Sequence, residues 1–207
     1  DWLPGGASSA GAGAFTRALG TDADLGTLSR EAARSCEPPA IVYPLASERG
    51  ERFPFIATDV TLALPDALTG EPVQTYRSLS YGIAAVERLC FDYLRTTGFP
   101  INGQISLTGG GIKSAYLNEL RATMLNRQLV VPAIAEPALG MALLASTIER
   151  SLSDASRDMV RIAHRIDPDP ALRAEADDYY TAFVDDLRAK GWLTPALAGQ
   201  AQGHAKA

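Results

Sequence analysis

Three consecutive glycines, between a predicted strand and a predicted helix, form the strongest chemical signal in this chain. They stand in the run Thr108–Ser114, which reads Thr-Gly-Gly-Gly-Ile-Lys-Ser. Glycines let backbone N–H groups approach an anion or a flat ring, and the helix N-terminus that follows adds partial positive charge. The spacing is neither that of a P-loop nor that of a Rossmann fingerprint. From the residues alone, a nucleotide site and a merely tight turn both stay open.

The other reactive side chains give no catalytic pattern. The chain has two cysteines, Cys36 and Cys90, and two histidines, His164 and His204, and none of them shows metal-ligand spacing. No serine or cysteine stands in a nucleophile elbow. We therefore predict no catalytic residue and no metal site within this chain. Cys90 falls on the apolar face of a predicted helix, which favours a buried structural thiol, and His164 is expected to have a surface or packing role.

Composition narrows the class of protein. The 207 residues are 46% hydrophobic and 21% charged, so the chain can build a core and is not of the disordered class. The net charge of -5 argues against general nucleic-acid binding. No apolar run approaches the roughly 18 residues that a membrane span needs. Two cysteines without a disulfide framework predict a cytoplasmic protein.

The elements that must position the glycine turn alternate between strand and helix. A helical stripe of apolar residues predicts a long helix over 75–97, ended by a glycine. Residues 104–108 and 129–131 are typical of strands, and 114–125 of a helix between them. A further helix begins at Pro137, and its many apolar residues predict that it is well buried. This order predicts an α/β fold with a parallel pair of strands.

The remaining segments carry weaker signals. Residues 40–44 form a short β-type run ended by proline, and the charges around Glu51 predict a cluster of structural ion pairs with neighbouring arginines. A last helix begins near Asp169, with an aromatic-rich apolar face. We expect one domain over 1–195 and a flexible tail over 196–207.

The order of the motifs resembles the C-terminal part of the FGGY family of carbohydrate kinases. Leu107–Ser114 is similar to the nucleotide-binding turn of the family, and the other segments resemble its glycine-rich entry, its Gly-Glu-Arg-x-Pro turn, its central helix and its Glu-x-x-x-Leu-Gly-Ala-Ala helix. These segments follow one another in the order of the family: Leu3–Ala12, Gly50–Pro54, Tyr76–Ala84, Leu107–Ser114 and Glu136–Ala145. The match covers nearly the whole chain apart from the tail.

The resemblance implies an actin-like, ribonuclease H-like fold with two lobes that close over a cleft. The chain would be the second half of the C-terminal lobe, the lobe that holds adenine and ribose, and its partial sheet would leave an exposed edge. By position, Gly110 and Ser114 would contact the adenosine, while Gly109 and Gly111 would shape the turn. Gly11 and Phe15 would line the other side of the adenine slot, where Phe15 could pack against the ring.

The resemblance also implies a function. The parent reaction would transfer the γ-phosphoryl group of MgATP to a sugar hydroxyl, with a pentulose such as xylulose as the favoured substrate. The catalytic Asp and most Mg ligands would lie in the missing N-terminal lobe, so this chain alone is expected to be inactive. Departures from the family pattern at Tyr81, Thr123 and Asn126 keep open a non-catalytic nucleotide-binding or interaction module of the same fold. A homodimer also stays open.

Overall fold

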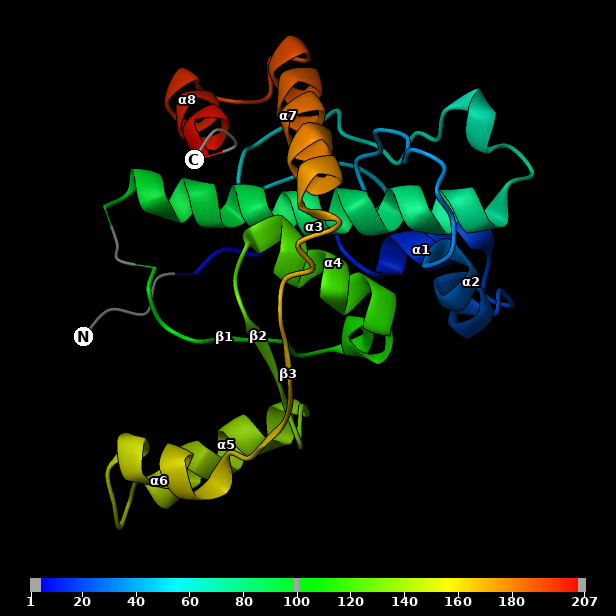
Figure 1. Cartoon of the computed structure of the whole chain (residues 1–207). Coiled ribbons are helices and arrows are strands. Elements are labelled where there is room, and N and C mark those ends of the chain that lie inside the picture. Colours follow the sequence, from blue (N-terminus) through cyan, green and yellow to red (C-terminus); the bar gives the residue numbers. More distant parts are fainter. Residues whose placement is uncertain (1–4, 99–100, 205–207) are drawn as a thin grey trace.

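The computed structural model describes residues 5–98 and 101–204, and it is built around one long helix with shorter helices on both sides and a small sheet beneath (Figure 1). The helices are α1 (Gly13–Leu19), α2 (Leu25–Ala32), α3 (Pro72–Thr96), α4 (Ala115–Leu125), α5 (Pro137–Ser146), α6 (Leu152–Met159), α7 (Arg173–Ala189) and α8 (Pro195–His204). The strands are β1 (Ile105–Ser106), β2 (Leu129–Pro132) and β3 (Ile162–Ile166). Short 3-10 turns occur at Asp66–Leu68 and Gly110–Lys113.

The sheet has the order β1-β2-β3. β1 and β2 are parallel, with Ile105 opposite Leu129, which confirms the predicted parallel pair. β3 pairs antiparallel to β2 and was not predicted, because its short run of mixed side chains is largely exposed and lacks a clean alternation. Within the described residues β1 pairs only with β2, so the other side of β1 is the exposed edge that was expected.

Helix α3 is the axis of the core. Pro72 occupies its first turn, and Gly98, with φ of 78°, follows its end as the sequence predicts. The helix is buried on more than its apolar stripe, because charged side chains on its other faces meet partners from α7. Arg88 pairs with Asp177 at 2.6 Å, and Tyr180 donates its hydroxyl proton to the buried Asp92 at 2.5 Å.

Residues 40–44 do not form the predicted strand. They run across α3 as irregular chain, and the only strand-like contact of this region among the described residues is a bridge between Ala10 and Leu45. The segment passes very close to the helix at Gly82. A Cβ built on Gly82 would lie 2.4 Å from the Val42 carbonyl oxygen, so only glycine allows this crossing.

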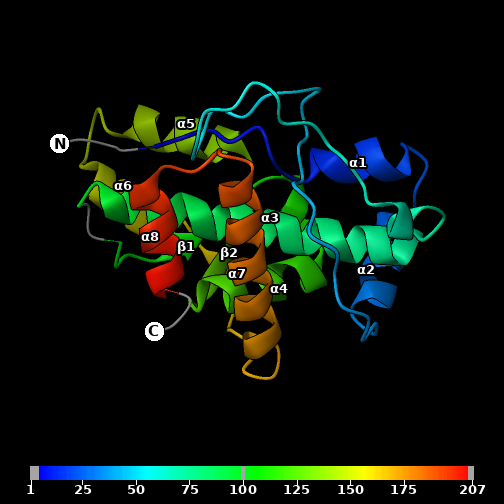
Figure 2. The same ribbon diagram turned by 90° about the horizontal axis from the view of Figure 1, so that it is seen from above.

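Helices α7 and α8 cover the upper side of α3, as the view from above shows (Figure 2). The aromatic face predicted for the last long helix is confirmed, since Tyr180 and Phe183 are fully buried. The prediction of a flexible tail over 196–207 is wrong for its described part. Residues 195–204 are helical, because Leu197 and Ala201 share one face four residues apart and bury it against the core.

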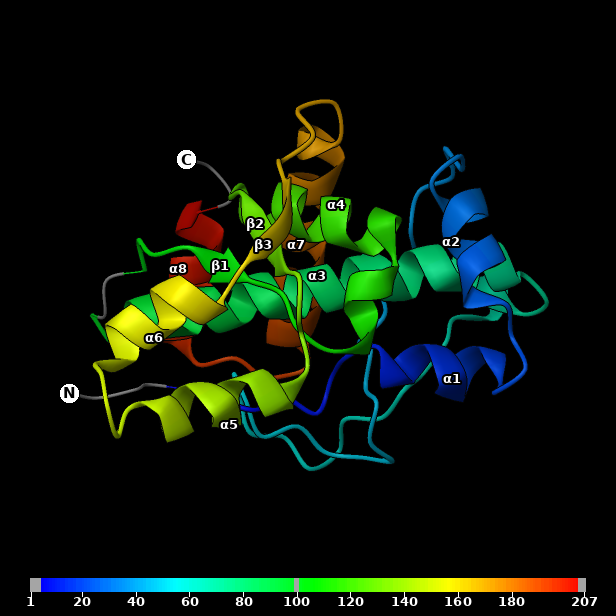
Figure 3. The same cartoon turned by 90° about the horizontal axis from the view of Figure 1, so that it is seen from below.

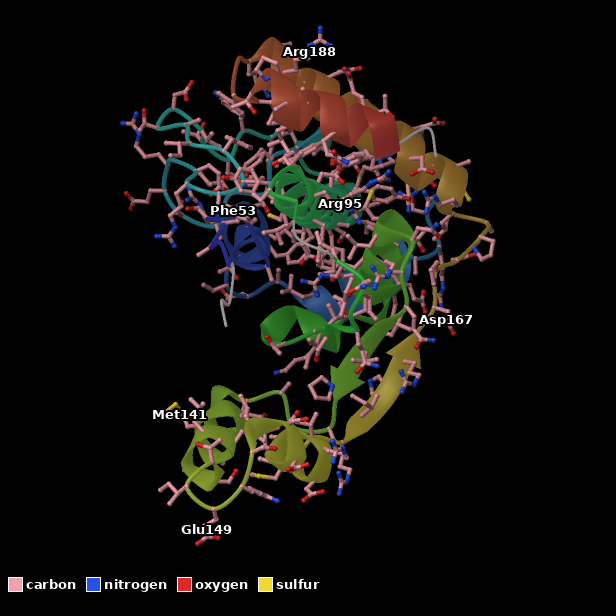
Figure 4. All side chains as sticks on the ribbon, turned by 90° about the vertical axis from the view of Figure 1, so that its left-hand side faces the viewer. Phe53, Arg95, Met141, Glu149, Asp167 and Arg188 are labelled. Carbon is pink, nitrogen blue, oxygen red and sulfur yellow. The ribbon has the colours of Figure 1, made fainter. Side chains whose placement is uncertain are left out.

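Helix α5 is exposed, which corrects the prediction that it is well buried. It projects from the body together with α6, which packs against it, at the end of β2 and β3 (Figures 1 and 4). Its apolar residues are distributed around the helix, so no single partner helix can cover them. The large apolar side chains exposed on and around this unit are Ile134, Met141, Leu144, Ile148 and Leu152.

Glu51 accepts hydrogen bonds instead of forming the predicted ion pairs. It is buried, and it accepts from the hydroxyls of Ser8 at 2.7 Å and Tyr43 at 2.6 Å and from the backbone N–H of Ser9 at 2.7 Å. Arg52 turns away and donates its Nε–H to the Ala7 carbonyl. The carboxylate thereby fixes the path of the glycine-rich segment that leads into α1.

Two further predictions can be compared with the structure. Cys90 is half-buried rather than fully buried, and burial raises the pKa of its thiol to about 12, as for an unreactive thiol. His164 is exposed on β3, as expected for a surface residue. Among the described residues, no helix is long and apolar enough to cross a membrane.

Candidate nucleotide-binding site

A pocket of about 580 Å³ lies beside the glycine turn. Its walls come from α1, α2, the first turns of α3, and the segment from Gly110 to Leu117 that enters α4. Figure 3 shows these helices gathered around the N-terminal half of α3. Of the residues predicted to bind adenosine, the structure brings Phe15, Gly110, Gly111 and Ser114 together in this lining.

The glycine turn has the backbone shape that the sequence predicts. Gly109 has φ of 84°, a conformation that strains residues with a Cβ, so it shapes the turn without lining the pocket. Gly110 lines the pocket, and a Cβ there would meet nothing within 4 Å, so the turn leaves open space beside its backbone. Asn118 donates its side-chain N–H to the Ile112 carbonyl at 2.8 Å and ties the turn to α4.

Ser114 joins three helices through one oxygen. Its Oγ caps α4 by accepting the Leu117 N–H at 3.1 Å, and it also accepts the Tyr76 hydroxyl proton at 3.0 Å. The Ser29 hydroxyl on α2 lies 2.9 Å away. Ser114 therefore holds α2, α3 and α4 together at the pocket wall. A direct hydrogen bond from its oxygen to a ligand would compete with these contacts.

Replacing Ser114 by alanine is expected to destabilise the protein by about 2 kcal/mol, because it removes a helix cap and leaves the Tyr76 hydroxyl without its acceptor. Ser151→Ala is the matched control, since Ser151 caps α6 through the Asp154 N–H at an exposed position. Urea unfolding measures both. Equal losses in the two variants would show that the contacts with Tyr76 and Ser29 contribute nothing.

Phe15 lies in the pocket wall, and its ring already has an aromatic partner. It stacks on Tyr76 with the ring centroids 4.4 Å apart and the planes at 12°. Phe15 is buried, so it offers the pocket an apolar edge or the part of its face that Tyr76 leaves free. Gly11 does not line the pocket; its N–H donates to the Pro44 carbonyl at 3.1 Å, and it sets the start of α1.

Helix α2 supplies the part of the pocket that sequence reasoning missed. Leu25, Gly26, Ser29 and Arg30 all line it. The available signal was the start of the helix, where Asp24 caps the Thr27 N–H at 3.0 Å. Bonds from the Thr27 hydroxyl and N–H lower the pKa of Asp24, so this cap carries charge at neutral pH. A cap predicts a helix but does not say against which turn the helix packs.

The charges of the pocket favour an anion. Arg30 and Lys113 are the only charged residues of the described lining. The charged Asp24 lies just outside that lining and interacts with Arg30, so Lys113 is the cation of the pocket with no carboxylate among the described lining residues. This is notable in a chain with 24 acidic and 19 basic side chains. The Arg30 guanidinium is held by the Thr27 hydroxyl at 2.8 Å. Apolar walls with cations and a helix N-terminus suit a ligand that has a flat apolar part and an anionic part.

A second cleft, of about 690 Å³, lies on the other side of the turn. Lys113 borders both spaces. The second cleft mixes cations with the carboxylates of Glu119, Asp167 and Asp169, so its charge favours no one class of ligand. Among the described residues, no group of three or more His, Cys, Asp or Glu side chains could hold a metal ion.

Solved structures with a similar fold include several sugar kinases. The chain is similar to a ligand-bound xylulose kinase from Lactobacillus acidophilus, with a TM-score of 0.69 and 19% identity over 89% of this chain and 39% of that one. It is similar to a xyloylose kinase from Brucella ovis, with a TM-score of 0.68 and 23% identity over 86% of this chain and 38% of that one. A glycerol kinase from Plasmodium falciparum with ADP matches with a TM-score of 0.61 and 19% identity over 83% of this chain and 35% of that one.

These similarities define the fold as the actin-like, ribonuclease H-like C-terminal lobe of sugar kinases, which is the predicted class. The chain spans about 39% of the length of the first of these kinases, so its fold corresponds to part of theirs. Residues 3–148 match the C-terminal domain of the FGGY family of carbohydrate kinases. The chain belongs to that family. The resemblance drawn from the motifs is confirmed, and the matched region includes the whole pocket lining.

Proposed function

We propose that this chain is the ATP-binding lobe of a carbohydrate kinase and that the pocket beside the glycine turn holds the adenosine of ATP or ADP. The observation that carries the proposal is the position of the pocket. It lies against Gly110 and Gly111 of the family-like turn, it has apolar walls, and its charged lining is cationic. Gly110 lines the pocket, and a Cβ there would meet no protein atom within 4 Å, which fits a flat ligand that approaches the backbone closely.

The residues of this chain would bind and orient the nucleotide. Gly110 would contact the adenosine, with Gly109 and Gly111 shaping the turn, and Phe15 would line the opposite wall. Ser114 would act mainly by holding α2, α3 and α4 in place, because its oxygen is already engaged by all three. Gly11 would not contact the nucleotide and would act by setting the start of α1, the helix that carries Phe15.

The cations would serve the anionic part of the ligand. Arg30 and Lys113 would attract the phosphates, and the N-terminus of α4 would favour the same charge. When bound, MgATP supplies the γ-phosphoryl group that is transferred. We place Mg and the catalytic carboxylate outside this chain, on an N-terminal lobe, because the match covers only 39% of the similar xylulose kinase.

The exposure of helix α5 also favours an N-terminal lobe that packs against this chain. Its apolar side chains, such as Met141 at 68% and Leu144 at 56% exposure, would be covered in an intact kinase. We propose a pentulose such as xylulose as the sugar, since several similar solved structures are xylulose kinases. Two unpaired cysteines, Cys36 and Cys90, favour a cytoplasmic protein.

Titration of the purified chain with ADP, followed by an assay of ATP consumption with xylulose, tests the proposal. We expect saturable ADP binding and no phosphoryl transfer, because the groups that act on the sugar are proposed to lie elsewhere. A folded chain that does not bind ADP would overturn the nucleotide site. Sugar-dependent ATP consumption by this chain alone would overturn its dependence on a second lobe.

A non-catalytic nucleotide-binding module is the alternative, and ADP binding does not separate it from the kinase lobe. The gene upstream of Asp1 does. A Gly-x-Asp-x-Gly-Thr motif and a later Asp encoded in the same frame would support the kinase. A natural start near Asp1 would support the module.

A further inference from the structure

Three hydroxyl groups meet at the pocket wall, and their proton positions follow from the hydrogen-bond pattern. They belong to Ser29 on α2, Tyr76 on α3 and Ser114 at the cap of α4. Ser114 Oγ accepts from the Leu117 N–H at 3.1 Å and from the Tyr76 hydroxyl at 3.0 Å. A serine oxygen has two lone pairs, and these two donors occupy both.

The contact between Ser29 and Ser114 therefore has one direction. The two oxygens lie 2.9 Å apart, and geometry alone permits either to donate. Since both lone pairs of Ser114 are occupied, Ser114 must donate its own proton to Ser29 Oγ. This leaves the proton of the Ser29 hydroxyl unused by the trio.

Serines and threonines within helices commonly return such a proton to the carbonyl four residues earlier. Among the described residues Ser80, Thr123 and Thr181 do so, at 2.8–2.9 Å. Ser29 makes no such bond to Leu25, and within residues 5–98 and 101–204 its hydroxyl has no protein partner other than Ser114. Ser29 is nonetheless buried and lines the pocket, so its donor faces a space where water or a ligand must satisfy it.

We infer that the Ser29 hydroxyl donates a hydrogen bond to a ring nitrogen of the bound purine, an inference that rests on the proposed nucleotide site. The walls around Ser29 are apolar, with Leu25 and Leu117 beside it and the stacked Phe15 and Tyr76 nearby. The flat, apolar part of a nucleotide belongs in such surroundings, and the acceptors on that part are its ring nitrogens. Ser29 is thus a ligand-contacting residue, and Ser114 positions it.

The test is ADP affinity, measured by calorimetry, for the unmodified chain and for Ser29→Ala. We expect the variant to bind ADP about 3- to 10-fold more weakly, the loss of one hydrogen bond. Ser80→Ala is the matched control, because the Ser80 proton is returned to the Tyr76 carbonyl and Ser80 does not line the pocket. Ser80→Ala should keep the affinity of the unmodified chain, whatever it costs in stability.

Deaza analogues of ADP identify the acceptor and separate contact from structure. In 1-, 3- and 7-deaza-ADP, one ring nitrogen at a time is replaced by C–H. We expect one of the three analogues to bind the unmodified chain about 3- to 10-fold more weakly than ADP, the same loss as for Ser29→Ala. That analogue should lose nothing further with Ser29→Ala, since the bond is already absent. Unchanged affinity of Ser29→Ala, or additive losses with every analogue, would overturn the inference.

The two proposals fail in distinguishable ways. If the unmodified chain does not bind ADP, the nucleotide site is wrong, and the role of Ser29 falls with it. If the chain binds ADP and Ser29→Ala does not fold, the analogue series on the unmodified chain decides. Equal affinity for ADP and all three analogues would then overturn the role of Ser29 alone.

Discussion

Gly110→Val is expected to reduce ADP binding about 100-fold or more while the protein stays folded. A Cβ at this position meets no protein atom within 4 Å, and the backbone of Gly110 does not have the positive φ that strains other residues. The added isopropyl group therefore costs little in the free protein. It occupies the pocket against the turn, where the adenosine would approach the backbone, and the resulting overlap is worth several kcal/mol of binding energy. Calorimetric titration with ADP measures the loss.

Gly103→Val is the control for this substitution. Gly103 is exposed in the loop before β1, a Cβ there also meets nothing within 4 Å, and the residue does not line the pocket. It should leave both ADP affinity and the thermal midpoint close to those of the unmodified chain. A folded Gly110→Val protein with unchanged ADP affinity would show that the adenosine does not lie against this turn.

The sequence predicts the site to the extent that its signals are local. The residues of Thr108–Ser114 suffice to predict its structure, because consecutive glycines and a capping serine specify a turn and a helix start without contacts from other segments. The long helix α3 was predicted for the same reason, since its apolar stripe and its glycine stop lie within one stretch of chain. The positions of Phe15 and Ser114 in one lining followed only from the resemblance to the family.

The parts that escaped prediction depend on distant segments. Ser29 lies 85 residues from Ser114 in the chain, and nothing in the sequence near either residue indicates their contact. The apolar residues of α5 predicted burial, but among the described residues α6 is the helix that packs against it, and much of α5 stays exposed. The charges around Glu51 suggested ion pairs, whereas the fold brings hydroxyls and N–H groups to the carboxylate.

Glu51 also influences the pocket, because its carboxylate anchors the segment that enters α1. The Ser9 N–H and the Ser8 hydroxyl bind it, and the adjacent Ala10 then forms its bridge with Leu45. Helix α1 follows at once and carries Phe15 into the pocket wall. A change at Glu51 should therefore affect both the stability of the chain and the order of that wall.

Glu51→Ala is expected to destabilise the protein by about 3 kcal/mol, because the Tyr43 hydroxyl and the Ser9 N–H would lose a charged acceptor in a buried place. Glu48→Gln is the control, since Glu48 lies in the same loop but is exposed. That substitution should stay within about 0.5 kcal/mol of the unmodified chain. Urea unfolding at neutral pH measures both, and equal stabilities would contradict the anchoring role of Glu51.

The same carboxylate predicts how stability depends on pH. Burial alone would raise the pKa of Glu51, but the bonds from the Ser9 N–H and the hydroxyls of Tyr43 and Ser8 outweigh it and hold the pKa below its ordinary value. A lowered pKa in the folded state means that the stabilisation is complete above the ordinary glutamate pKa and is lost as the pH falls through the folded value. Unfolding midpoints measured from about pH 6 down to about pH 3 should therefore fall more steeply for the unmodified chain than for Glu51→Gln, which cannot take up this proton. Parallel profiles for the two proteins would mean that the hydrogen bonds to Glu51 do not favour its charged form.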